Sequence, residues 1–114
     1  MSNKKNTVVL IVAAGSGIRA KSVTPKQYLK IGGKYVLERT IENFINVEMV
    51  DYISVVINKN HNANYKSVSS MFTSKKILPY CIGGNTRSDS VKKGLMSLKK
   101  YGIDKVLIHD AARP

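Results

Sequence analysis

The stretch that decides the fold reads Val-Val-Leu-Ile-Val-Ala-Ala-Gly-Ser-Gly and occupies residues 8–17 of this 114-residue chain. Its apolar part is nearly continuous, which is typical of a parallel strand covered on both faces. It then stops in alanine and glycine, and small residues let a ligand approach the backbone closely. The stretch therefore predicts a buried strand over residues 7–13, followed by a ligand-binding loop.

Two cations on that loop indicate the charge of the ligand. Arg19 and Lys26 both follow the glycines. Guanidinium and ammonium groups beside an approachable backbone suit an anion, and a polyphosphate fits best. A second apolar strand near the end of the chain, residues 106–108, leads to a carboxylate and an arginine at Asp110 and Arg113.

Two other glycine loops do not fit the stretch. Residues 15–20 satisfy the loose dinucleotide fingerprint, but that motif requires an uninterrupted helix and a carboxylate at the end of the next strand. Pro25 interrupts the helix, and the next strand ends at Asn58 without a carboxylate. Residues 33–34, Gly-Lys, lack the upstream glycine and the hydroxyl residue of a P-loop. Both alternatives are therefore disfavoured.

Composition bounds the class of protein. The hydrophobic share of 43% and the charged share of 23% are ordinary for a soluble globular chain. A single cysteine, Cys81, excludes an internal disulfide and favours a reducing compartment. No apolar run approaches the roughly 18 residues that span a membrane. We therefore predict at most one domain, located in the cytoplasm.

The net charge of +12, from 19 Lys and Arg against 7 Asp and Glu, raises an alternative function. A basic nucleic-acid-binding module would carry such an excess. However, the lysines are spread over every segment, aromatic residues do not alternate with them, and no nucleic-acid motif is recognisable. Solvated lysine-rich faces explain the charge better, and the excess also attracts small anionic ligands.

Strands and helices alternate along the rest of the chain. Apolar runs at residues 53–57, 77–82 and 106–108 are predicted strands, and Pro79 shortens the second of these or places it at a sheet edge. The apolar positions at helical spacing are Leu37, Ile41, Phe44 and Ile45; Tyr65, Val68 and Phe72; and Val91, Leu95 and Leu98. The alternation predicts a Rossmann-like three-layer α/β/α fold with a mainly parallel sheet and right-handed crossovers.

Three loops are predicted to meet at one edge of this sheet. In parallel sheets, ligands bind at the carboxyl ends of the strands, and residues 15–26, 83–90 and 110–113 all lie there. Thr86 followed by Asp89 resembles a capping box, so Asp89 is better explained as part of a helix start than as a metal ligand. The convergence favours a single ligand site.

Four motifs along the chain carry a resemblance to a known family. They are Ala13-Ala14-Gly15-Ser16-Gly17-x-Arg19, Pro25-Lys26-Gln27-Tyr28-Leu29, Gly83-Gly84-x-x-Arg87-x-x-Ser90-Val91 and His109-Asp110-Ala111-Ala112-Arg113-Pro114. Together they closely resemble the 2-C-methyl-D-erythritol 4-phosphate cytidylyltransferases of non-mevalonate isoprenoid biosynthesis. The resemblance implies a nucleotide-diphospho-sugar transferase type of fold. It also implies transfer of CMP from CTP to the methylerythritol phosphate, with release of pyrophosphate and with a divalent metal, usually Mg²⁺.

The resemblance also implies roles for individual residues. Arg19 and Lys26 correspond to cations that grip the triphosphate, Asp110 to a metal ligand and Arg113 to an arginine on the substrate side. The positions implied to bind the nucleotide are Ala13, Ala14, Gly15, Gly17, Gly84, Asn85, Ser90 and Ala111. Ser90 could equally cap the first turn of a helix. By strand alternation, His109 should point away from Asp110, which favours packing or a hydrogen bond over a role as a base.

Departures from the family pattern qualify these implications. Ile18 and Ala20 stand where many members have arginine and methionine, and Asn85 replaces an acidic residue seen in some. Family members are also longer, so residues 1–114 are interpreted as the N-terminal portion of one incomplete nucleotidyltransferase domain, inactive alone, from a homodimeric protein. A ribitol phosphate or other sugar-phosphate pyrimidine nucleotidyltransferase stays open as the enzyme alternative.

Overall fold

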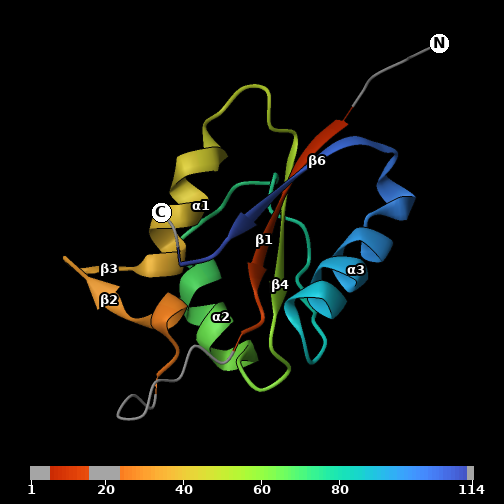
Figure 1. Cartoon of the computed structure of the whole chain (residues 1–114). Helices are drawn as coiled ribbons and strands as arrows, with labels where there is room; N and C mark the ends of the chain where they lie inside the picture. Colours follow the sequence, from red (N-terminus) through yellow and green to blue (C-terminus); the bar gives the residue numbers. More distant parts are fainter. Residues whose placement is uncertain (1–5, 16–23, 113–114) are drawn as a thin grey trace.

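The computed structural model describes residues 6–15 and 24–112 and contains a four-stranded parallel sheet in the order β5-β4-β1-β6 (Figure 1). The strands are β1 (Asn6–Ala13), β4 (Tyr52–Ile57), β5 (Cys81–Ile82) and β6 (Ile103–Asp110). The helices are α1 (Val36–Ile45), α2 (Asn62–Ser69) and α3 (Arg87–Ser97), with 3₁₀ turns η1 (Lys26–Tyr28) and η2 (Lys99–Tyr101). The predicted α/β fold with a mainly parallel sheet is confirmed.

The strand order reverses beside β1. The chain adds β4 and then β5 on one side of β1, and the crossover through α3 returns to pair β6 with the other side. At the carboxyl end, Ala13 pairs with Ile57 and Val12 pairs with Asp110. Such a reversal leaves a crevice outside the carboxyl ends of the strands. The loop after β1 therefore begins at the topological switch point.

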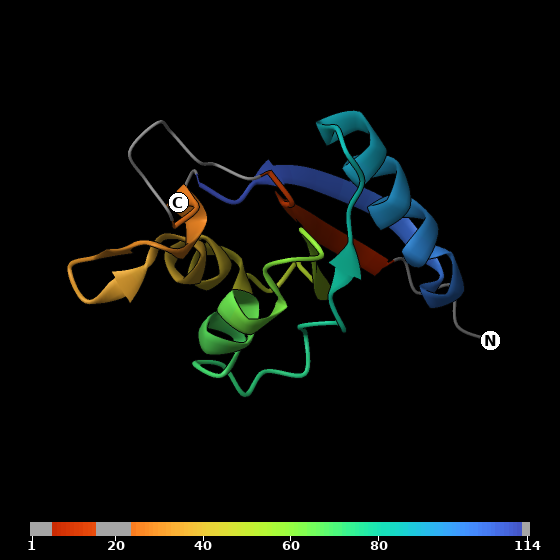
Figure 2. The ribbon, with the colours of Figure 1, turned by 90° about the horizontal axis from the view of Figure 1, so that it is seen from below.

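Alternate residues of β1 supply a core on each face of the sheet, with α1 and α2 on one side and α3 on the other (Figure 2). Val9 and Ile11 belong to the cluster that includes Leu37 and Ile41 of α1. Leu10 belongs to the opposite cluster, and all five side chains are fully buried. Burial on both faces is the reason that the sequence of β1 is apolar without alternation.

The buried stripe of α3 differs from the prediction. Leu98 is buried as expected, but Leu95 is 39% exposed and Val91 is only half-buried. The helix turns Ser90 and Gly94 toward the interior instead. Hydrophobic spacing alone chose the wrong face because the interior side of α3 carries small residues.

Gly94 explains how α3 lies so close to the sheet. A Cβ atom at this position would lie 2.8 Å from Cγ2 of Val56 and 2.9 Å from Cδ1 of Leu10. Both neighbours are fully buried. A side chain at position 94 would therefore displace the helix or the core.

The predicted third strand, residues 77–82, is much shorter in the structure. Only Cys81–Ile82 pairs with β4 as β5, while Ile77 makes one isolated parallel bridge to Ile53. Pro79 lies between these two points and has no N–H for the ladder. The expected position at the sheet edge is confirmed.

The helices are short. α1, α2 and α3 contain 10, 8 and 11 residues. Within residues 6–15 and 24–112, no helix has the length and apolar character needed to cross a membrane.

α2 ends at Ser69 rather than at Phe72, and a turn from the N–H of Phe72 to the carbonyl of Ser69 follows. Phe72 still packs against the core beyond the helix end.

A small hairpin projects from the body between η1 and α1 (Figure 1). Its strands are β2 (Lys30–Ile31) and β3 (Lys34–Tyr35). The two residues between them, Gly32 and Gly33, have φ angles of 62° and 84°. Positive φ at both positions suits a tight hairpin turn and strains residues that carry a side chain.

Candidate functional site

The three loops predicted to converge do so at the carboxyl end of the sheet. They enclose a hollow of about 230 Å³, here called the strand-end hollow. Its lining residues are Val12, Ala14, Gly15, Gly84, Asn85, Thr86, Arg87, Ser90 and Asp110. The end of β1, the turn before α3 and the end of β6 thus form one site at the switch point.

The turn before α3 is held by Ser90. The hydroxyl of Ser90 accepts a hydrogen bond from the backbone N–H of Gly84 at 3.1 Å, and Ser90 is 1% exposed. A Cβ atom on Gly83 would lie 2.5 Å from Oγ of Ser90 and 2.6 Å from Cβ of Ala14. Gly83 is therefore required for the close approach of two loops, a role that its place in the motif did not indicate.

The first turn of α3 faces the hollow. Oγ1 of Thr86 accepts a hydrogen bond from the N–H of Asp89 at 3.0 Å, so the predicted cap is confirmed in its Thr86 half. The N-terminus of a helix presents backbone N–H groups and a positive dipole end, which favour an anion. The start of α3 therefore contributes a positive dipole end to one side of the hollow.

Asp110 lines the hollow from the end of β6. Its Oδ1 is 3.2 Å from Nε of Arg87, and the two side chains are 37% and 60% exposed. An exposed ion pair of this kind is worth little and exchanges readily with other partners. Arg87 belongs to one of the four motifs but is not among the predicted site residues, and the structure adds it to the site.

Ala111 lies behind the hollow and is 3% exposed. Its N–H donates to the carbonyl of Val12 at 3.0 Å, and its carbonyl accepts from Oγ1 of Thr40 at 2.7 Å.

The ring of His109 packs edge-on against Phe44 at 5.1 Å between centroids, so the predicted packing role of His109 is confirmed.

Lys26 opens the 3₁₀ turn η1 and is exposed. The next two residues, Gln27 and Tyr28, are buried at 5% and 4% exposure. Burial raises the pKa of the Tyr28 hydroxyl, and desolvation lowers the pKa of His61, whose ring contacts Tyr28 at 5.6 Å. Buried side chains thus anchor the segment that presents Lys26.

The predicted site residues fall into separate groups. Those that line the strand-end hollow are Ala14, Gly15, Gly84, Asn85, Ser90 and Asp110. Ala13 and Ala111 are buried behind it, and Lys26 is on η1. Gly17, Arg19 and Arg113 lie outside the described residues.

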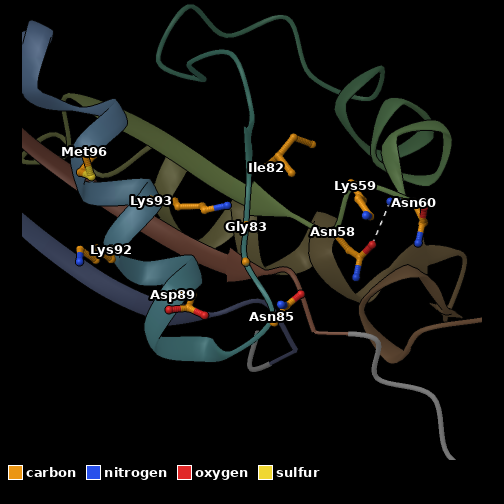
Figure 3. A pocket seen from close by; sticks show the side chains of 11 residues that line it. Asn58, Lys59, Asn60, Ile82, Gly83, Asn85, Asp89, Lys92, Lys93 and Met96 are labelled. Atoms are coloured by element: carbon orange, nitrogen blue, oxygen red, sulfur yellow. Dashed lines mark hydrogen bonds between the residues drawn. The ribbon is translucent and has the colours of Figure 1, made fainter.

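A larger cavity of about 690 Å³ lies along the turn before α3 (Figure 3). We call it the lysine cavity because Lys59, Lys92 and Lys93 contribute to its lining. Its other lining residues are Asn58, Asn60, Ile82, Gly83, Gly84, Asn85, Asp89 and Met96. Gly84 and Asn85 line both cavities, so the turn separates the lysine cavity from the strand-end hollow.

The switch-point sheet and the small-residue loop at its carboxyl edge define a Rossmann-like α/β protein with a candidate ligand site at the strand ends. A family model described as 2-C-methyl-D-erythritol 4-phosphate cytidylyltransferase, IspD, matches residues 7–114. The chain belongs to this IspD family.

Curated relatives and solved structures agree with the family model. The chain is 46% identical over 113 residues to a bifunctional enzyme IspD/IspF of Wolbachia pipientis, covering 99% of this chain and 28% of that protein. A structure of 4-diphosphocytidyl-2C-methyl-D-erythritol synthase from Anaerococcus prevotii matches at TM-score 0.79 and 33% identity, over 96% of this chain and 44% of that one. The Francisella tularensis 2-C-methyl-D-erythritol 4-phosphate cytidylyltransferase (IspD) matches at TM-score 0.71 and 38% identity, over 96% and 46%. The chain thus spans less than half the length of these proteins.

Proposed function

We propose that this chain is the N-terminal part of a longer protein that transfers CMP from CTP to 2-C-methyl-D-erythritol 4-phosphate and releases pyrophosphate. The observation that carries the proposal is the strand-end hollow, where Gly15, Gly84 and Asp110 meet in a chain of the IspD family. Membership of that family favours this acceptor over ribitol phosphate.

In the proposed reaction, a phosphate oxygen of the acceptor attacks the α-phosphorus of CTP. The new P–O bond forms as the bond to the bridging oxygen breaks, and pyrophosphate leaves with that oxygen. The protein aligns two polyanions and neutralises developing charge without a covalent intermediate. Lys26 and Arg19 contact the triphosphate, with the arginine better shaped to bind two oxygens. Arg113 contacts the acceptor.

The backbone of the strand-end hollow receives the nucleoside part. We assign this role to Ala13, Ala14, Gly15, Gly17, Gly84, Asn85, Ser90 and Ala111. Ser90 acts through the turn that it holds, because its hydroxyl already accepts the N–H of Gly84. The N–H of Ala111 is likewise already used, since it donates to the carbonyl of Val12, so Ala111 also acts by shaping the site.

The residues present fit a bound Mg²⁺ ion. Asp110 offers a hard carboxylate donor among the residues that line the hollow. The described residues contain no group of three or more His, Cys, Asp or Glu that could hold a metal, so the protein would supply few of the ligands. Mg²⁺ commonly takes one or two carboxylates and completes its shell with water and substrate phosphates. The ion would neutralise phosphate charge, and Asp110 would exchange its contact with Arg87 for it.

The full-length protein is the right sample for a test of this proposal. It should release pyrophosphate from CTP only when methylerythritol phosphate and Mg²⁺ are both present. Asp110→Asn should lower turnover by on the order of a hundredfold and change its dependence on Mg²⁺ concentration. Asp104→Asn is the matched control, because Asp104 is an exposed carboxylate on the same strand, away from the site.

Other outcomes would redirect the assignment. Turnover with ribitol phosphate and not with methylerythritol phosphate would move the acceptor assignment to the alternative. Unchanged Mg²⁺ dependence in Asp110→Asn would remove that residue as a ligand. Cytoplasmic location and a homodimeric state belong to the same proposal, and sedimentation of the purified protein measures the second.

A further inference from the structure

Side-chain amides hold three consecutive backbone carbonyls at the end of β1. Nε2 of Gln27 donates to the carbonyl of Ala13 at 2.9 Å and to that of Gly15 at 3.0 Å. Nδ2 of Asn58 donates to the carbonyl of Ala14 at 3.3 Å. The loop that opens the strand-end hollow is thus fixed from two sides by residues outside it.

The two amides are themselves fixed. Gln27 is 5% exposed, and its single amide nitrogen donates to both carbonyls. Oδ1 of Asn58 accepts the N–H of Asn60 at 2.9 Å, drawn as a dashed line in Figure 3, which sets the orientation of the Asn58 amide. A buried amide with two short hydrogen bonds is a more rigid anchor than a half-buried amide with one long bond.

The carbonyl contacts determine where the backbone N–H groups point. No peptide bond among the described residues is cis, and in a trans peptide the C=O and N–H point in opposite directions. The peptide that joins Ala13 to Ala14 therefore turns its N–H away from Gln27. The peptide that joins Ala14 to Gly15 turns its N–H away from Asn58. Ala14 and Gly15 both line the hollow.

We propose that Gln27 is a positioning residue for the nucleotide site. It keeps the carbonyl oxygens of Ala13 and Gly15 turned toward η1 and away from the hollow, and in the same turn it places Lys26. Without Gln27, these peptides can rotate and turn their carbonyl oxygens, in place of their N–H groups, toward the bound nucleotide. The inference rests on the proposed function, because it concerns the same CTP site.

The chain offers a matched control at the opposite end of β1. Nδ2 of Asn6 also donates to two backbone carbonyls, those of Tyr101 at 3.1 Å and Gly102 at 3.5 Å. Asn6 is the first residue of β1, and Ala13 is its last. Loss of the Asn6 amide therefore removes the same kind of contact at the end of the strand remote from the hollow.

The experiment compares Gln27→Met with Asn6→Leu in the full-length protein. Each variant keeps the approximate side-chain volume and removes the donor. Misplacement of reacting groups by about 1 Å can cost roughly a hundredfold in rate. Gln27→Met should raise the KM for CTP and lower kcat/KM by about tenfold to a hundredfold, while Asn6→Leu should leave both near wild type. Thermal unfolding is followed for both variants.

A pH profile adds a readout that a purely structural role would not move. Gln27→Glu places a carboxylate against two carbonyl oxygens, and its protonated form restores one donor. Burial raises the pKa of such a carboxyl above its ordinary value of about 4.3. The kcat/KM of Gln27→Glu, divided by that of wild type, should therefore increase as the pH falls from about 8 to about 6.

The results separate two failures. A wild-type protein without CTP-dependent pyrophosphate release refutes the proposed function. If the wild type is active but Gln27→Met keeps its KM for CTP, the positioning role is refuted. The same conclusion follows if Gln27→Met and Asn6→Leu lose activity only in proportion to their loss of thermal stability, or if the Gln27→Glu ratio is flat with pH.

Discussion

The two faces of the sheet are packed by different means. On one face, α1 contributes large, fully buried side chains, with Leu37 and Ile41 at 0% exposure. On the other face, α3 contributes Gly94 to the contact and leaves Leu95 and Met96 exposed at 39% and 57%. The first face is therefore stabilised by apolar area, and the second by close approach of helix and strands.

The small residues of α3 also affect the candidate site. Close approach brings the first turn of α3 against the turn at Gly83, where Ser90 holds the N–H of Gly84. Large residues on the inner side of α3 would move that turn away from the end of β1. Small residues therefore serve both the packing of this face and the construction of the strand-end hollow. Four substitutions test the comparison.

Ile41→Ala should have the largest effect. The side chain is fully buried in the α1 face, and such truncations cost about 2–5 kcal/mol in the free energy of unfolding. Urea unfolding of the chain measures the loss. Ile41→Val is the control and should cost about 0.5–1.5 kcal/mol. A loss below about 1 kcal/mol for Ile41→Ala would contradict a core based on buried area.

Gly94→Ala should destabilise the chain by about 1–3 kcal/mol, because the new Cβ meets Val56 and Leu10 in a filled core. Helix propensity alone predicts the opposite sign, a gain of about 1 kcal/mol. Urea unfolding decides between them. Lys93→Ala, at an exposed position of the same helix, is the control and should change little. A more stable Gly94→Ala chain would show that close approach does not hold α3.

Tyr65→Phe tests a weak point of the α1 face. The hydroxyl of Tyr65 is buried without a hydrogen-bond partner among the described residues, and burial raises the pKa of Tyr65 to about 12 from an ordinary value of 10.0. The folded state holds this proton more tightly than the unfolded state, so stability is present below pH 10 and falls as the pH rises toward 12. Tyr65→Phe should reduce that alkaline loss and should not destabilise the chain at neutral pH.

Urea unfolding at about pH 8 and about pH 11 makes the measurement, on either side of the ordinary tyrosine pKa. Tyr80→Phe is the control, because the ring of Tyr80 contacts that of Tyr65 but is 37% exposed. An unchanged alkaline loss in Tyr65→Phe would contradict the argument from burial.

Leu95→Gln should have the smallest effect. The side chain is partly exposed on the outer side of α3, and exposed substitutions usually stay within about 0.5 kcal/mol. Urea unfolding of the 114-residue chain provides the value. Leu98→Gln, at a position that is 2% exposed, should cost several times more. Equal losses for the two variants would mean that the outer side of α3 is packed after all.

Local patterns predicted the parts of the fold that depend on buried apolar runs. β1 and β4 were found because strands buried on both faces need continuous apolar sequence. β6 was found from the short apolar run at residues 106–108, although Leu107 and Ile108 are 45% and 44% exposed at the sheet edge. The inner side of α3 was missed because a helix held by glycine and serine has no apolar periodicity to detect. The length of β5 was overestimated, although Pro79 marked the place where pairing fails.

The candidate site divides in a similar way. The meeting of Gly15, Gly84 and Asp110 at one edge of the sheet was predicted because they lie at, or just after, the carboxyl ends of strands. Gln27 and Asn58 act through hydrogen bonds to residues 12 to 44 positions away, and no spacing rule reports such contacts. The sequence offered only weak signals for these roles. Gln27 directly follows the cation Lys26 in one of the motifs, and Asn58 directly follows β4.

The central place of β1 has a consequence for synthesis of the protein. Among the described strands β1 is made first, but its partner on one flank, β6, begins only at Ile103. At about 5–20 residues per second, a ribosome needs roughly 5 to 20 seconds to reach β6 after completing β1. During that interval the nascent chain carries an apolar strand with an unpaired edge, the kind of surface that chaperones bind. The order of strands in the finished sheet thus sets the interval in which the growing chain is most exposed to aggregation.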